Sequence, residues 1–137
     1  GSFLLNPDGF QHAPYSNEGC ILFVKLRQYP GMSRKQVTIN MLDEQWKNMG
    51  TGASSLTLYA EDGYPERILM TRLDIDSHLT IPSKSGGAEL FLLSGTLEDQ
   101  AGHYSTGDWL RWPAQEERTF AAVDPVTVYV KTGHLPS

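Results

Sequence analysis

Cysteine and long apolar runs are both scarce in this chain. Cys20 is the single cysteine, so no disulfide can form within the chain, and a reducing cytoplasm is the expected compartment. Its apolar sequence neighbours predict a buried thiol. The longest apolar run, residues 20–24, is far shorter than the roughly 20 residues that cross a bilayer. No charged segment followed by an apolar stretch indicates a signal peptide, so we expect a cytoplasmic protein outside the membrane.

Positive charge is scarce as well. The chain has 11 Lys and Arg against 16 Asp and Glu, which gives a formal net charge of −5. No basic block interrupts this balance. Nucleic acid and anionic membrane surfaces are therefore excluded as expected partners on electrostatic grounds. The 137 residues have room for one domain with a substantial core.

Helical periodicity is nearly absent, because only residues 42–49 could form a helix, of about one turn. Alternating apolar positions and β-branched residues instead predict many short strands. Glycine and proline turn signals separate them. Strands at roughly ten-residue spacing predict an antiparallel sandwich or barrel. The expected strands are residues 20–25, 55–60, 67–74, 79–81, 89–94, 108–112, 118–122 and 125–131.

The last stretch of the chain repeats the first. Residues 107–135 align without a gap on residues 1–29 at an offset of 106, with glycine, leucine, proline and Val-Lys matches at equivalent positions. We therefore expect residues 1–29 to be the C-terminal fragment of one repeat. Residues 30–34 are the expected linker, and residues 35–137 are the expected complete domain.

Several motifs follow one another in a recognisable order. Residues 86–95 read Gly-Gly-Ala-Glu-Leu-Phe-Leu-Leu-Ser-Gly, and residues 103–107 read His-Tyr-Ser-Thr-Gly. Residues 5–12 read Leu-Asn-Pro-Asp-Gly-Phe-Gln-His, and residues 18–25 read Glu-Gly-Cys-Ile-Leu-Phe-Val-Lys. This pattern resembles the ChrR-like cupins, named for the zinc-binding domain of a bacterial anti-sigma factor. The resemblance implies an all-β fold, an antiparallel cupin jelly-roll barrel over about residues 35–135, with extra N-terminal strands from a partial second cupin.

The resemblance also implies where a metal would bind. In that family two histidines, a glutamate and a later histidine converge inside the barrel, and such sites suit zinc, iron, manganese or nickel. Here Pro82, Lys84, Ala88 and Arg118 stand at those four positions. The implied metal site is therefore degenerate. A one-residue slip would offer the carboxylate of Glu89, although the family pattern directs that side chain outward.

The one histidine outside the complete copy is the remaining metal candidate. His12 keeps the last ligand position in the partial copy, opposite Arg118 in the repeat. It could bind zinc or iron only if other ligands, such as those of a second chain, completed the site. The alternative is a surface histidine. The isolated His78, His103 and His134 are expected to be solvated.

Two cations at former ligand positions suggest a different ligand. If Lys84 and Arg118 point inward, they could bind a carboxylate or phosphate, and Glu89 is the third candidate ligand-binding residue. We therefore expect an anionic small molecule in the barrel. The alternative is that both side chains extend to solvent while apolar residues fill the barrel. Glu116 and Glu117, next to Arg118 in sequence, could neutralise it.

No catalytic arrangement is visible, so we expect no catalytic residue and lean against an enzyme. The acidic pairs Asp74/Asp76 and Glu98/Asp99 are interpreted as solvated turns. The favoured function is a non-catalytic module for small-ligand binding, regulation or dimerisation, without a cofactor. The alternative is a metal-dependent cupin, either a zinc-binding sensor or a dioxygenase-like enzyme.

The N-terminal strands raise a separate question of pairing. A strand at residues 20–26, without the other strands of the cupin repeat to which it belongs, would be an unpaired and aggregation-prone strand edge. It can join the sheet of its own barrel or pair with a second chain. Because two-fold homodimers are the commonest oligomers, we expect a homodimer through these strands.

Overall fold

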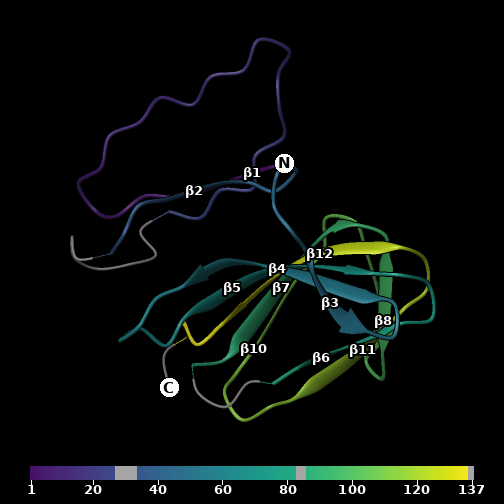
Figure 1. Cartoon of the computed structure of the whole chain (residues 1–137). Coiled ribbons are helices and arrows are strands. Elements are labelled where there is room, and N and C mark those ends of the chain that lie inside the picture. The colour runs from purple at the N-terminus through teal and green to yellow at the C-terminus, as the bar shows by residue number, and fades with distance from the viewer. Residues whose placement is uncertain (27–33, 83–85, 136–137) are drawn as a thin grey trace. The chain divides into compact units, whose positions relative to one another are not determined.

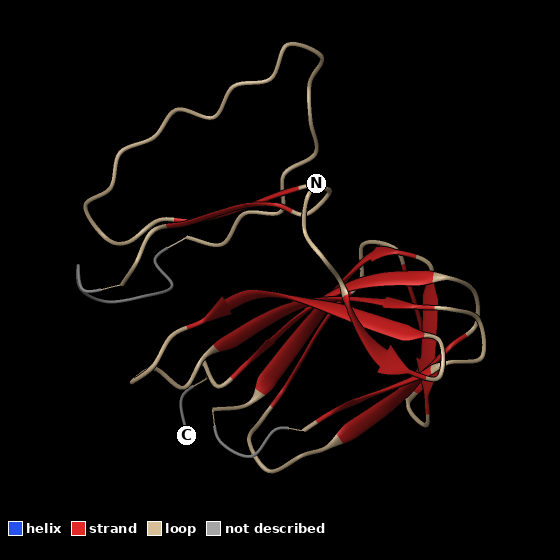
Figure 2. Cartoon of the chain, in the orientation of Figure 1, coloured by secondary structure: helices blue, strands red, loops and turns tan. Residues whose placement is uncertain are grey.

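The chain folds as strands and turns. The structure is a computed structural model, and it describes residues 1–26, 34–82 and 86–135. In this described part there is no helix, and hence none long and apolar enough to cross a membrane (Figure 2). The chain divides into two compact units, unit 1 (residues 1–42) and unit 2 (residues 43–137). The all-β expectation is confirmed.

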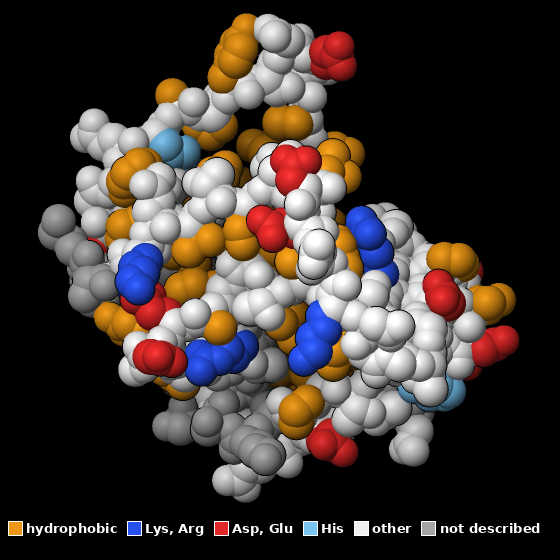
Figure 3. Space-filling view, in the orientation of Figure 1, with side chains coloured by type: hydrophobic (Ala, Val, Ile, Leu, Met, Phe, Trp, Pro, Cys, Tyr) orange, Lys and Arg blue, Asp and Glu red, His pale blue; other side chains and the backbone are white. Residues whose placement is uncertain are grey.

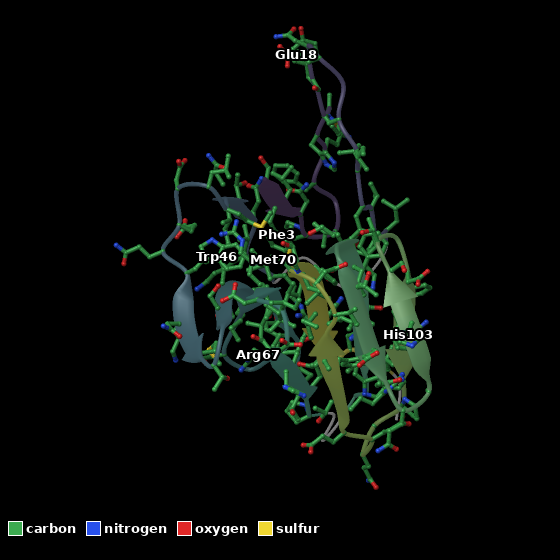
Figure 4. All side chains as sticks on the ribbon, turned by 90° about the vertical axis from the view of Figure 1, so that its right-hand side faces the viewer. Phe3, Glu18, Trp46, Arg67, Met70 and His103 are labelled. Atoms are coloured by element: carbon green, nitrogen blue, oxygen red, sulfur yellow. The ribbon has the colours of Figure 1, made fainter. Side chains whose placement is uncertain are left out.

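Unit 1 contains a two-stranded antiparallel sheet. Strand β1 (Ser2–Leu5) pairs with β2 (Val37–Asn40), from Ser2 opposite Asn40 to Leu5 opposite Val37. A long loop leaves β1, and Glu18 lies at its tip (Figure 4). Residues 20–26 within this loop do not form the expected strand, and Cys20 is exposed. Both predictions for this stretch are therefore wrong, because strand propensity alone does not form a strand, which also needs hydrogen bonds to a neighbouring strand.

Unit 2 consists of two antiparallel sheets that enclose a core, as in a jelly roll (Figure 1). The six-stranded sheet has the order β10-β7-β12-β5-β4-β3, and the four-stranded sheet has the order β6-β11-β8-β9. The six strands are β3 (Lys47–Gly50), β4 (Ala53–Ala60), β5 (Arg67–Leu73), β7 (Ala88–Ser94), β10 (Trp109–Trp112) and β12 (Val126–Thr132). The four strands are β6 (His78–Ile81), β8 (Thr96–Asp99), β9 (Gly102–Ser105) and β11 (Arg118–Ala122).

Most expected strands of unit 2 are present within one or two residues. The expected helix at residues 42–49 is wrong, because residues 41–43 form a turn and β3 begins at Lys47. The β8–β9 hairpin was not predicted. Both of its strands are four residues long and rich in polar residues, so they lack the alternating apolar pattern.

The core of unit 2 follows from alternation along its strands. Ala88, Leu90 and Leu92 of β7 share one face and are fully buried. Across from them, Phe120 of β11 is also fully buried, in the same cluster. Side chains that alternate along a strand point to opposite faces, so β7, β11 and β12 each supply every second residue to the core. Burying each large apolar side chain contributes about 1.5–3 kcal/mol.

The turn between β7 and β8 requires glycine. Gly95 has a φ of +86°, and a Cβ there would overlap the carbonyl oxygen of Pro125 and lie 2.9 Å from Val126 Cα. Gly63 has a φ of +85°, but a Cβ there would meet nothing within 4 Å. A side chain would therefore carry the same backbone penalty at both positions, but only at Gly95 would its Cβ collide with neighbouring atoms.

We expect Gly95→Ala to destabilise unit 2 by about 3 kcal/mol, combining the left-handed backbone penalty with overpacking. Gly63→Ala, the matched control, should cost only about 1 kcal/mol, from the backbone alone. Urea unfolding followed by circular dichroism measures both. Equal losses for the two variants would contradict the close approach at Gly95.

Candidate functional site

Strand β11 directs Arg118 to the core side of its sheet. Arg118 alternates with Phe120 and Ala122, and both of these belong to the core. The guanidinium carbon lies 5.1 Å from the ring centroid of Phe120, 5.4 Å from that of Trp112 and 5.8 Å from that of Tyr104. The Arg118 side chain is 17% exposed. The cation therefore lies among aromatic rings at the edge of the barrel core, where cation–π contacts are favourable.

The β8–β9 hairpin supplies the counter-ion. Arg118 Nη2 donates to Asp99 Oδ2, and Asp99 is 8% exposed. Arg118 Nη2 also donates to Tyr104 Oη at 3.0 Å, and the Tyr104 hydroxyl donates to Asp99 Oδ1 at 3.0 Å. Backbone N–H groups of Ala101 and Gly102 donate to the same Oδ1 at 2.8 and 3.2 Å. The three side chains thus form a closed network, which we call the Arg118 triad (Arg118, Asp99 and Tyr104).

The triad favours its charged form. Burial alone would raise the pKa of Asp99, but the N–H of Ala101, the Arg118 guanidinium and the Tyr104 hydroxyl together hold that pKa below its usual value. For Arg118, burial opposes the charge, while the oxygens of Tyr104 and Asp99 outweigh it and raise the pKa. An ionised pair with its hydrogen bonds satisfied is the stable state of this site.

This network corrects two sequence interpretations. Asp99 was expected to be solvated at a loop tip, but its side chain is only 8% exposed and is paired with Arg118. The neutralising carboxylate of Arg118 is Asp99 rather than Glu116 or Glu117, which are exposed. Arg118 was found from the repeat, whereas Asp99 and Tyr104 were missed. The only local signal for Asp99 was its place at the start of the Asp-Gln-Ala-Gly turn.

The pH dependence of stability follows from the lowered pKa of Asp99. Ionised Asp99 stabilises the folded state above the pKa of the unfolded chain, about 3.9. This contribution is lost as the pH falls toward the lower folded-state pKa. We expect urea unfolding between about pH 5 and pH 2 to show this acid loss, and Asp99→Asn to remove that part of the slope. Parallel curves for the two proteins would contradict the assignment.

The resemblance implies four metal-ligand positions, and the structure describes three of them. The side chains at these three positions are not metal ligands. Pro82 is exposed, Ala88 is fully buried and apolar, and Arg118 is a cation held by Asp99. Lys84 lies outside the described residues. Trp112 stands opposite Ala88 in register, and its ring centroid lies 5.9 Å from that of Phe120. Within residues 1–26, 34–82 and 86–135, no group of three His, Cys, Asp or Glu side chains could hold a metal.

Glu89 does not join the Arg118 triad. It alternates with Ala88 and Leu90 and faces away from the core cluster, although it is 1% exposed. In register it stands opposite Lys131 of β12 and Arg111 of β10. Its Oε2 lies 3.2 Å from His134 Nε2. His134 is 10% exposed, so the expectation that it is solvated is wrong.

The other histidines lie at exposed positions. His12 of unit 1 is exposed, and its Nδ1 lies 3.2 Å from Asn6 Nδ2 and so accepts from that amide. His103 projects from β9 and pairs with Glu98 at 3.2 Å (Figure 4). His78 is exposed at the start of β6. The involvement of His12 in a metal site stays a prediction.

Comparisons with known proteins agree with the barrel. A family model of the ChrR cupin-like domain matches residues 34–136. A chain of the complex between Rhodobacter sphaeroides SigE and the anti-sigma ChrR is 17% identical, with a TM-score of 0.58, over 68% of this chain and 51% of that chain. This chain thus spans about half the length of that one.

Two further solved structures share the fold. A suggested acetylacetone dioxygenase from Methylibium petroleiphilum is 13% identical, with a TM-score of 0.61, over 81% of this chain and 80% of the other. A conserved protein of unknown function from Streptococcus pyogenes is 24% identical, with a TM-score of 0.51, over 62% and 75%. No curated protein sequence matches the chain. On the evidence of the two-sheet barrel and the family match over residues 34–136, the chain belongs to the ChrR cupin-like domain family.

Proposed function

We propose that the chain is a non-catalytic association module, in which the cupin barrel does not use a metal and unit 1 contacts a partner. The Arg118 triad is the observation that carries this proposal. It sets a cation with its own carboxylate at a position where the family pattern implies a metal ligand. A cation at that position repels a divalent metal, and the aromatic rings around it supply no ligand.

The association part of the proposal rests on unit 1. Its loop exposes Ile21, Leu22, Val24 and Leu26, with exposed fractions of 101%, 61%, 60% and 80%. Orange apolar side chains follow this loop in the space-filling view (Figure 3). Contiguous exposed apolar residues mark interaction surfaces in soluble proteins. Two copies of the chain are the simplest partners, so we propose a homodimer through the N-terminal segment in a reducing cytoplasm.

An anionic small molecule is the second candidate ligand. The Arg118 guanidinium already binds a carboxylate, that of Asp99, so its chemistry suits such a ligand. An external anion would have to displace Asp99 from Arg118. The expected contribution of Lys84 and Glu89 to this site stays a prediction.

Sedimentation velocity at micromolar concentrations tests the homodimer. We expect the parent chain to sediment as a dimer and Ile21→Asp to weaken association at least tenfold, because a charge would be buried in the contact. Leu42→Asp is the matched control, since Leu42 is also exposed in unit 1 but lies outside the apolar segment. A monomeric parent, or equal effects of both substitutions, would overturn the homodimer.

A further inference from the structure

Residues 20–26, the donor segment, have the composition of a strand buried on both faces. The segment reads Cys-Ile-Leu-Phe-Val-Lys-Leu and forms no strand in unit 1. A strand with one solvated face alternates apolar and polar residues, whereas a strand buried on both faces reads as a continuous apolar run. The donor segment therefore matches the interior of a two-layered structure rather than an edge exposed to water.

The internal repeat identifies its counterpart. At the offset of 106, residues 20–26 align with β12, residues 126–132. Strand β12 is hydrogen-bonded on one side to β5 and on the other to β7. Its inward side chains Val126, Val128 and Val130 are at most 4% exposed. Their equivalents, Cys20, Leu22 and Val24, are all small or apolar enough for the same core face.

A charge is repeated along with the apolar pattern. Lys25 aligns with Lys131, which is 1% exposed and stands opposite Glu89 of β7 in register. A buried ammonium group requires a partner of opposite charge nearby. If the donor segment pairs with its neighbours as β12 pairs with β5 and β7, the neighbouring strand must therefore carry a carboxylate opposite Lys25.

We propose that residues 20–26 form a donor strand that completes a second antiparallel cupin sheet. The strand enters between two strands equivalent to β5 and β7, and the β7 equivalent carries a carboxylate opposite Lys25. This is strand addition, in which main-chain hydrogen bonds supply affinity and alternate side-chain positions supply specificity. The proposal rests on the proposed association through unit 1 and names its partner as a cupin barrel open at its last strand.

The barrel of unit 2 is not itself this acceptor. Strand β12 already occupies the position between β5 and β7. At a sheet edge, such as β10 or β3, the donor segment would form one ladder instead of two. When no open cupin sheet is present, contact between the apolar segments of two copies gives the homodimer described above.

A strand graft within the full chain tests this complementarity, with the chain's own barrel as the probe. In the in-register graft, residues 126–132 are replaced by the sequence of residues 20–26. In the slipped graft, they are replaced by the sequence of residues 19–25, which sends every side chain to the opposite face. Both grafts have nearly the same composition, so they differ chiefly in register.

We expect the in-register graft to unfold cooperatively within about 10 °C of the parent melting temperature, and the slipped graft to lose its cooperative transition. Glu89→Gln should lower the melting temperature of the parent and of the in-register graft alike. The proposal would be overturned if the in-register graft unfolded like the slipped graft. It would also be overturned if Glu89→Gln left the melting temperature of the in-register graft unchanged. Sedimentation of the parent reports separately on the homodimer, so failure of either claim can be told from failure of the other.

Discussion

Asp99→Ala is expected to destabilise unit 2 by about 3 kcal/mol at neutral pH. The substitution leaves the partly buried Arg118 cation without its counter-ion and removes the acceptor of the Tyr104 hydroxyl and of two backbone N–H groups. Removing one partner of a buried ion pair costs about 3–5 kcal/mol. The lower end applies here, because the Arg118 side chain retains 17% exposure and water can reach part of the charge.

A double-mutant cycle separates the ion pair from general loss of packing. Arg118→Met combined with Asp99→Ala should be less destabilising than the sum of the two single substitutions, because no unpaired charge remains. Glu98→Ala is the neighbouring control. Its partner His103 is exposed, so its loss should cost less than about 1 kcal/mol. Additive effects in the cycle, or an Asp99→Ala variant as stable as Glu98→Ala, would contradict a buried pair.

Strands with one apolar face were predictable from the sequence, because alternation directly reports burial. The strands β7, β11 and β12 illustrate this, since each carries core residues at every second position. The donor segment has even stronger strand character, but it forms no strand in the described part of unit 1. Local propensity is not sufficient for a strand, because a ladder requires neighbours with free N–H and C=O groups.

The candidate site was only half predictable. The repeat and the family pattern both indicate Arg118, because each relates positions along the sequence. Its partner Asp99 lies 19 residues away, and Tyr104 lies 14 away, and their meeting depends on the pairing of β8 with β9 and β11. That hairpin has little apolar alternation, so the charge partner could not be inferred before the sheet was seen.

We also expect the chain to bind no metal that contributes to its stability. A cupin with an intact ligand set would bind close to one metal per barrel, since neutral imidazoles and a carboxylate converge on it. Here the described ligand positions carry Pro82, Ala88 and Arg118, and the cation is fixed in place by Asp99. Removing metal with a chelator should therefore leave the melting temperature of the chain unchanged.

A positive control can be made from the same chain. Restoring the implied ligands with Pro82→His, Lys84→His, Ala88→Glu and Arg118→His, together with Asp99→Asn, removes the opposing cation and the carboxylate that held it. If the barrel geometry suits a cupin site, this variant should acquire metal where the parent does not. The comparison guards against loss of metal during purification.

The most direct measurement is elemental analysis of the purified parent chain for zinc, iron, manganese and nickel after growth in medium supplemented with all four. The account predicts less than about 0.1 metal per chain, because the site offers a paired cation instead of a ligand set. About one tightly held metal per chain, lost on chelation together with a fall in melting temperature, would contradict it.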